Sequence, residues 1–390
     1  MNQVPSMSWS DRTGLVVGAG ATVGLGALWV LARQPWRLER WYVEGAGPPL
    51  QALVCAFTRH VPSSLAEWLE AGSAAVALGW LVWVGVRVLR GRGRRARELG
   101  RAALTAWIAV SAVGFWFYVA WGLAYARPSA RERMGWAAPG APSIEIELPE
   151  LTAVGSAMVD RVNQLYDELH GWPDAYVVSA APRGMEAVDR AVDVGWERMV
   201  AVEGLHPTVA RSRGPSKPLL SSVVFAYLGI GGFYFPFTAE ANVNALQPEW
   251  QRAFTLAHEK AHQRFVASED EANFFGFLAM IHAEDPFVRY GGWLFAQRQV
   301  LGALGERDPY GFWAVIERRY PGVQRDVNFG VAFWAQYDGR AHVLSSAVND
   351  RYLRFNGVAA GKHSYSESLQ LVVEWARHHP EVLGIGAPGR

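Results

Sequence analysis

Three long apolar runs near the N-terminus constrain this chain more than any other feature of its sequence. Residues 14–32 and 102–126 carry no charge, and residues 71–89 carry a single one, Arg87. A helix that crosses a bilayer needs about 20 apolar residues, because each residue advances it by about 1.5 Å. We therefore predict three transmembrane helices in a membrane region of residues 1–128, with the lipid bilayer as a partner. Three buried core helices are the alternative, but helices of soluble proteins normally have a polar face.

The arginines between the second and third runs predict how these helices are oriented. Residues 87–101 contain seven arginines and one acidic residue, Glu98. Arginine and lysine are enriched in the cytoplasmic loops of membrane proteins. We therefore expect this loop and the N-terminus in the cytoplasm, and the chain beyond residue 128 on the extracytoplasmic side.

The remainder of the chain has the composition of a linker followed by a soluble domain. Residues 128–149 contain four prolines, so we predict a linker at 129–150 and a folded domain at 151–390. A net charge of +1 gives no basic face for phosphates and argues against a nucleic-acid partner.

Local patterns within this domain predict helices and a small sheet. The apolar spacing of residues 160–169 and 185–202 is typical of amphipathic helices. Residues 223–237 are rich in aromatic and β-branched side chains, which predicts a strand pair or a bulged strand.

One motif in the second domain carries recognisable chemistry. The helical stretch that begins at Pro248 contains the sequence HEKAH, with His258, Glu259 and His262. Residues four apart lie on the same face of a helix, so both imidazoles can reach one zinc ion. Glu259 lies one step round the helix, where it can act as general base towards an attacking water. A pair of solvated histidines on a polar face is the alternative.

Zinc needs a third protein ligand, and the next helix start offers two carboxylates. Ser268 and Glu271 have the spacing of a capping box, which would occupy Glu271. Glu269 and Glu271 are about 200° apart around the helix, so one metal is not expected to take both. We predict Glu269 as the ligand, Glu271 as its alternative, and Asn273 as the group that orients the Glu269 carboxylate. The helix dipole also favours acids here without any metal.

Four further residues are candidates for the surroundings of the site. Glu240 and Asn242 precede the motif helix and either line a cleft that binds substrate or serve as turn and cap residues. Tyr352 and Tyr365 either donate a hydrogen bond to an oxyanion or have structural roles.

Several of these segments resemble a known family. HEKAHQRF, EDEANF and PFTAEANVN, together with residues 121–127 and C-terminal segments between 349 and 365, resemble a bacterial domain-of-unknown-function family of membrane-anchored HExxH proteins that are regarded as zinc metallopeptidases. The pattern is also similar to that of the Glu-zincins, although Glu269 follows His262 by only seven residues and the supporting residue is Asn273. The resemblance implies a multi-pass protein of the bacterial inner (plasma) membrane.

Together these patterns predict a mainly α fold: an N-terminal bundle of three transmembrane helices and a mainly helical, zincin-like α+β domain with a small sheet. The expected function is a metallopeptidase that uses Zn²⁺ and water to cleave a peptide or protein substrate. A zinc amidase acting on cell-wall material and a non-catalytic scaffold with a structural zinc are the alternatives.

Overall fold

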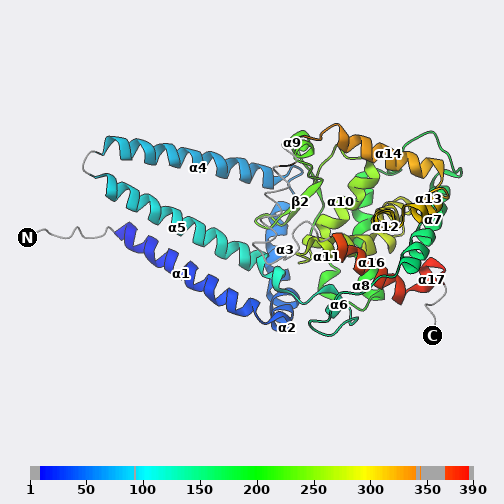
Figure 1. The fold of residues 1–390 in the computed structure, drawn as a ribbon. Coiled ribbons are helices and arrows are strands. Elements are labelled where there is room, and N and C mark those ends of the chain that lie inside the picture. The colour runs from blue at the N-terminus through cyan, green and yellow to red at the C-terminus, as the bar shows by residue number, and fades with distance from the viewer. Residues whose placement is uncertain (1–8, 92–93, 340–342, 344–364, 386–390) are drawn as a thin grey trace, which may run out of the picture. The chain divides into compact units, whose positions relative to one another are not determined.

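The chain is mainly helical and divides into two compact units (Figure 1). The computed structural model describes residues 9–91, 94–339, 343 and 365–385. The first unit comprises Met1–Val54, Leu65–Arg127 and Pro236–Thr238, and the second comprises Cys55–Ser64, Pro128–Phe235 and Ala239–Arg390. The predicted fold class, mainly α with three long apolar helices and a small sheet, is confirmed.

Three helices of the first unit are long and apolar enough to span a membrane, within the residues that the structure describes. They are α1 (Trp9–Ala32), α4 (Leu65–Arg90) and α5 (Arg95–Ala120). The most apolar stretch of α4 buries none of its residues inside the protein, and those of α1 and α5 bury 6% each. So much exposed apolar surface is unfavourable in water, and it is typical of helices that are long and apolar enough to span a membrane.

The third long apolar helix begins and ends earlier than the sequence predicts. It ends at Ala120 instead of residue 126, because the backbone of Trp121 leaves helical geometry and the chain continues as the 3₁₀-helix η2 (Gly122–Ala126). Next to η2, Arg127 forms a bidentate ion pair with Glu39, at 2.5 and 2.7 Å. Glu39 is the first residue of a π-helical segment. The ion pair therefore connects that segment to the chain just after η2, within the first unit.

The stretch between the first two spans is also helical, although the sequence patterns did not indicate it. It contains α2 (Pro35–Leu38), the π-helix η1 (Glu39–Ala46) and α3 (Gly47–Thr58).

Small residues in α1 allow close packing against α5. A Cβ atom on Gly18 would collide with the ring of Trp107, and one on Gly24 would lie 2.5 Å from the ring of Phe115. Larger residues at these two positions would force the helices apart. Small residues are used in this way between membrane-spanning helices, where close packing replaces the hydrophobic effect.

The second unit is built from helices around one apolar core. They are α6 (Ala130–Arg133), α7 (Leu148–His170), α8 (Met185–Val202), η3 (Pro207–Val209), α9 (Ser222–Tyr227), α10 (Glu249–His262), α11 (Glu269–Ile281), α12 (Pro286–Arg307), α13 (Pro309–Ile316), α14 (Pro321–Ala335), α16 (Tyr365–His378) and α17 (Pro380–Leu383). The tryptophans Trp196, Trp250, Trp293 and Trp375 are almost completely buried in this core. The helices α10, α11 and α12 pack against one another, and α7 packs along α12.

A small sheet lies against α10. Its strands are β1 (Lys217–Pro218), β2 (Gly232–Phe235) and β3 (Glu240–Val243), in the order β1-β3-β2. β2 runs antiparallel to β3 and β1 runs parallel to it, with Gly232 opposite Val243 and Phe235 opposite Glu240. β2 is therefore an edge strand among the strands that the structure describes.

The predicted strand pair at residues 223–237 is wrong in its first half. Residues 222–227 form the helix α9, and only residues 232–235 form a strand. The Ser222 hydroxyl donates to the carbonyl of Leu219 and accepts from the N–H of Ala245, which holds the helix start in place. Gly229, at a φ of 71°, supplies the left-handed residue that ends the helix. These contacts outweigh the strand preference of the valines.

The segment expected to be a linker packs into the second unit. It carries α6, and Ile146 near its end is 8% exposed. Arg131 of α6 forms an ion pair with Glu374 of α16, at 2.6 Å. Of the two predicted amphipathic helices, residues 185–202 coincide with α8, whereas residues 160–169 are the end of the longer α7.

Candidate metal centre

The helix α10 carries the HExxH motif and packs into the core through a face of buried residues that includes three alanines. Trp250, Ala253, Ala257 and Ala261 repeat at helical spacing and are buried in the core. Gly276 of α11 packs onto this face so closely that a Cβ atom there would lie 3.2 Å from the backbone nitrogen of His258. The alanines and the glycine thus let α11 approach α10 directly beside the motif.

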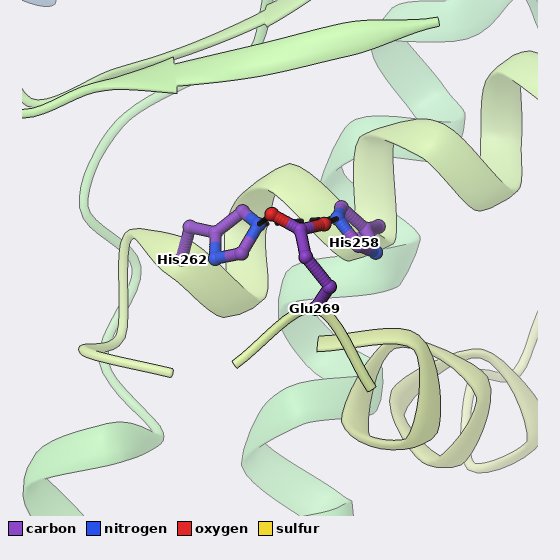
Figure 2. Close-up of side chains that lie close together, drawn as sticks. All are labelled: His258, His262 and Glu269. Carbon is purple, nitrogen blue, oxygen red and sulfur yellow. Dashed lines mark hydrogen bonds and ion pairs between the residues drawn. The ribbon is translucent and has the colours of Figure 1, made fainter. Parts of the chain in front are cut away.

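The close packing of α10 and α11 brings three potential ligands together. Figure 2 shows the carboxylate of Glu269, from the first turn of α11, between the imidazoles of His258 and His262. The Nε2 atoms of the two histidines are 3.1 Å apart. The Glu269 carboxylate lies 3.1 Å from Nε2 of His258 and 3.8 Å from Nε2 of His262. Within the described part of the chain, these three side chains form a group with the composition and proximity needed to hold a metal ion.

The hydrogen bonds on the far side of each imidazole set the direction of its lone pair. Nδ1 of His262 lies 2.6 Å from the backbone carbonyl of Val266, which can only accept a hydrogen bond. Nδ1 of His258 lies 2.9 Å from Oδ1 of Asn273. Each Nδ1 is therefore the donor, and in the neutral rings both Nε2 lone pairs point towards Glu269.

This donor set fits tetrahedral zinc. At zinc–nitrogen distances of about 2.0–2.1 Å, two tetrahedral ligand nitrogens are about 3.3 Å apart, close to the 3.1 Å between His258 and His262. Two imidazoles and a carboxylate are also the protein ligands of one class of catalytic zinc sites. Structural zinc sites take four protein ligands, whereas the group here offers three, in the part of the chain covered by the structure.

Electrostatic interactions keep the carboxylate of Glu269 charged. Although burial opposes ionisation of Glu269, hydrogen bonds from His258 and His262 hold its pKa well below its usual range. Burial alone would lower the pKa of His262, but its hydrogen bond and charge attraction to Glu269 outweigh burial and raise that pKa to about 9. Glu269 is thus an anion at neutral pH, which suits a ligand for a cation.

Glu259, the predicted general base, is buried next to this group. Glu259 is only 4% exposed, and its Oε2 atom has no hydrogen-bond partner among the described residues. The backbone N–H of Tyr234, in the edge strand β2, donates a hydrogen bond to the carboxylate. Burial raises the pKa of Glu259 to about 7, against the opposing effect of the two histidines. A carboxyl group with a pKa near neutrality can both accept and donate a proton.

The opposite face of α10 and the turn that follows the helix carry two buried cations that have carboxylate partners. Nζ of Lys260 lies 2.9 Å from Asp189 and 2.7 Å from Asp193, both on α8. Arg264 contacts Asp193 at 2.8 Å and stacks over the ring of Trp196. These cations attach α10 to α8 and leave its other face to the histidines.

The alternative ligand, Glu271, has different partners. The Ser268 hydroxyl accepts a hydrogen bond from the Glu271 N–H, which is one half of the predicted capping box. The second half is wrong, because the Glu271 carboxylate binds the N–H of Ala130 at 2.5 Å and the guanidinium of Arg133. These two groups belong to α6, which is distant in sequence, so a local pattern could not indicate them.

Asn273 supports a histidine and not the carboxylate that the sequence predicted. Its side-chain oxygen contacts Nδ1 of His258 at 2.9 Å. Two potential contributors were missed because they act through backbone atoms: the carbonyl of Val266 at His262 and the N–H of Tyr234 at Glu259. A backbone group leaves no residue-type signal, so only the position of β2 along α10 reveals the second contact.

The remaining candidates do not join this group in the described residues. Glu240 is buried in β3 and forms an ion pair with Lys217 of β1, and Asn242 donates to the backbone carbonyls of Phe233 and Glu240. Both are strand residues with structural partners, so the alternative that they are turn and cap residues is wrong. Tyr352 lies outside the described residues. Tyr365 begins α16, but its side chain also lies outside what is described.

Comparison with known proteins gives one match. The family model described as "Protein of unknown function (DUF3810)" matches residues 42–373, which include the second and third long apolar helices and the candidate metal centre. No curated protein and no solved structure matches the chain.

Proposed function

We propose that this chain, which belongs to the DUF3810 family of proteins of unknown function, is a membrane-anchored zinc metallopeptidase. One observation carries the proposal. Three convergent ligand atoms lie next to the buried carboxyl group of Glu259, whose Oε2 has no hydrogen-bond partner in the described structure. A purely structural site would need the ligands but would have no use for an incompletely hydrogen-bonded Glu259.

The proposed metal is zinc, held by His258, His262 and Glu269. Zinc at such a site polarises a carbonyl group and makes water a better nucleophile. Glu259 takes a proton from the attacking water and passes it to the leaving amine, for which a pKa of about 7 is well placed. The hydrogen bonds that His262 donates to the Val266 carbonyl and His258 donates to the Asn273 side-chain oxygen hold the two imidazoles in the required tautomer.

The edge strand β2 offers a binding surface for an extended peptide. Gly232 lies so close to Glu259 that a Cβ atom there would be 3.0 Å from Cγ of Glu259. An exposed strand edge can pair with a peptide through main-chain hydrogen bonds, which depend little on the peptide's sequence. This arrangement favours a peptide substrate over the amide bonds of cell-wall material, because those lie in shorter, branched chains.

The proposed location is a bacterial inner membrane, with the peptidase unit outside the cytoplasm. The arginines at residues 87–101 support this orientation. Reporter fusions after Arg95 and after Arg390 should therefore report opposite compartments. If both fusions indicated the same compartment, the proposed orientation would be contradicted.

The test of activity separates metal binding from catalysis. Full-length protein in detergent is loaded with zinc and screened against a peptide library, and Glu259→Gln is compared with the wild type on the best substrate. We expect unchanged zinc content and a rate lower by about 10²–10⁴-fold, the usual contribution of a general base. Glu197→Gln, an exposed glutamate on α8, is the matched control and should cleave at the wild-type rate. Equal rates for Glu259→Gln and wild type would refute the mechanism.

A further inference from the structure

A cavity of about 360 Å³ opens within the first unit. It lies where α4 ends and α5 begins, and one residue of α1, Gly14, contributes to it. Its lining consists of Gly14, Trp80, Trp83, Val84, Arg87, Glu98, Arg101, Ala102, Leu104, Thr105 and Ile108. A volume of this size is at the lower end of the range of about 300–1,000 Å³ that is typical of small-molecule sites.

The lining changes from charged to apolar along the helices. Arg87 lies in the last turn of α4, and Glu98 and Arg101 lie in the first two turns of α5. Deeper in the span the lining is Trp80 on α4 and Ile108 on α5. Ten residues separate Glu98 from Ile108, so the cavity extends over about 15 Å of helix. This is the polarity gradient of a phospholipid, from headgroup to acyl chain.

The charged end of the cavity has an excess of positive charge. Arg87 forms an ion pair with Glu98 at 2.9 Å, and its guanidinium stacks over the ring of Trp83. Arg101 adds a second cation, so the lining has two arginines and one carboxylate. Basic pockets between spanning helices on the arginine-rich side of a membrane are suited to anionic headgroups.

We propose that this cavity is a binding site for an anionic phospholipid. Arg101 and Arg87 bind the phosphate, and the acyl chain lies along Trp80 and Ile108. Glu98 holds Arg87 in position but also repels a second negative charge. The site therefore favours a lipid with one phosphate over a polyphosphorylated headgroup. The inference does not depend on the peptidase proposal, because none of its residues belongs to the second unit.

The test measures lipid binding to the full-length chain in non-ionic detergent by native mass spectrometry. Phosphatidylglycerol and phosphatidylcholine are titrated separately, and inorganic phosphate is added as a competitor at the same concentration. We expect phosphatidylglycerol to bind at least tenfold more tightly than phosphatidylcholine, and inorganic phosphate not to displace it, because the acyl chain contributes. Displacement by inorganic phosphate, or equal binding of the two lipids, would overturn the assignment.

Two matched pairs of variants locate the binding. Arg101→Gln should lower phosphatidylglycerol affinity by at least tenfold, whereas Arg90→Gln, an exposed arginine outside the lining, should lower it by at most about fivefold through the general surface charge. Ala102→Phe fills the cavity without a change of charge and should abolish the preference for phosphatidylglycerol. Ala103→Phe, on the exposed side of α5, should retain it. Equal effects within either pair would show that lipid binds elsewhere.

Discussion

The two sides of α10 satisfy their polar groups differently. On one side, Lys260 on α10 and Arg264 in the turn after it are completely buried and have Asp189 and Asp193 as partners. On the other face, the Nε2 atoms of His258 and His262 converge on Glu269, and Oε2 of the buried Glu259 has no partner in the described part of the structure.

From this difference we infer which polar residues serve folding and which belong to the proposed metal site. Buried charges that are paired hold helices in register, whereas buried groups with incomplete hydrogen bonding persist where a ligand or substrate completes them. We therefore expect variants of the first face to change stability and variants of the second face to change metal binding.

The largest expected effect is on stability, from Lys260→Met. This change keeps the volume of the side chain but leaves Asp189 without its buried cation, and breaking such a pair costs about 3–5 kcal/mol. Thermal unfolding of the full chain in detergent should show a large loss for this variant. Arg190→Met is the matched control on α8, because the ion pair of Arg190 with Glu186 is exposed and contributes about 1 kcal/mol or less. Similar losses for both variants would contradict the role assigned to the Lys260 face.

The second prediction compares the two neighbouring glutamates of α11. Glu269→Gln removes a ligand, so zinc affinity should fall by more than about 100-fold, the upper end of what the loss of a supporting hydrogen bond costs. Glu271→Gln should leave zinc affinity unchanged and destabilise the chain by about 1.5–3 kcal/mol, because it weakens the charged hydrogen bonds to α6. Competition with a chromophoric chelator measures the first effect, and thermal unfolding the second. If Glu271→Gln lost zinc and Glu269→Gln did not, the ligand assignment would be reversed.

The third and smallest effect is expected at Asn273. Asn273→Ala removes the hydrogen-bond acceptor of His258 Nδ1 and should lower zinc affinity by about 10–100-fold, with little change in folding. Asn273→Asp keeps an acceptor and should restore the affinity. The same chelator competition distinguishes the two variants, and an unchanged affinity for Asn273→Ala would mean that His258 needs no support.

The three long apolar helices and the motif could be predicted from the sequence because their signals are local. An uncharged run such as residues 14–32 fits few structures other than a membrane helix, and the helical spacing of His258 and His262 places both rings on one face. The structure also places Glu269 next to them, since α11 begins shortly after α10 ends.

The errors share a non-local cause. Glu271 has the spacing of a capping residue, but Arg133 and the N–H of Ala130 bind its carboxylate from a segment that was expected to be a linker. Asn273 contacts His258 because of how α11 crosses α10, which no spacing within one helix reveals. The helix α9 overrides the strand preference of its valines for a similar reason, since Ala245, more than twenty residues away, hydrogen-bonds to Ser222.

The zinc content of the purified full-length chain tests the central claim most directly. Metal analysis after dialysis against zinc should give one zinc per chain for the wild type and for Glu259→Gln, because Glu259 is a base and not a ligand in the proposed site. His258→Ala should give none, while Lys260→Met, measured at a temperature where it remains folded, should retain one. A wild-type chain without zinc, or a His258→Ala variant that keeps it, would contradict the assignment of His258, His262 and Glu269 as the metal centre.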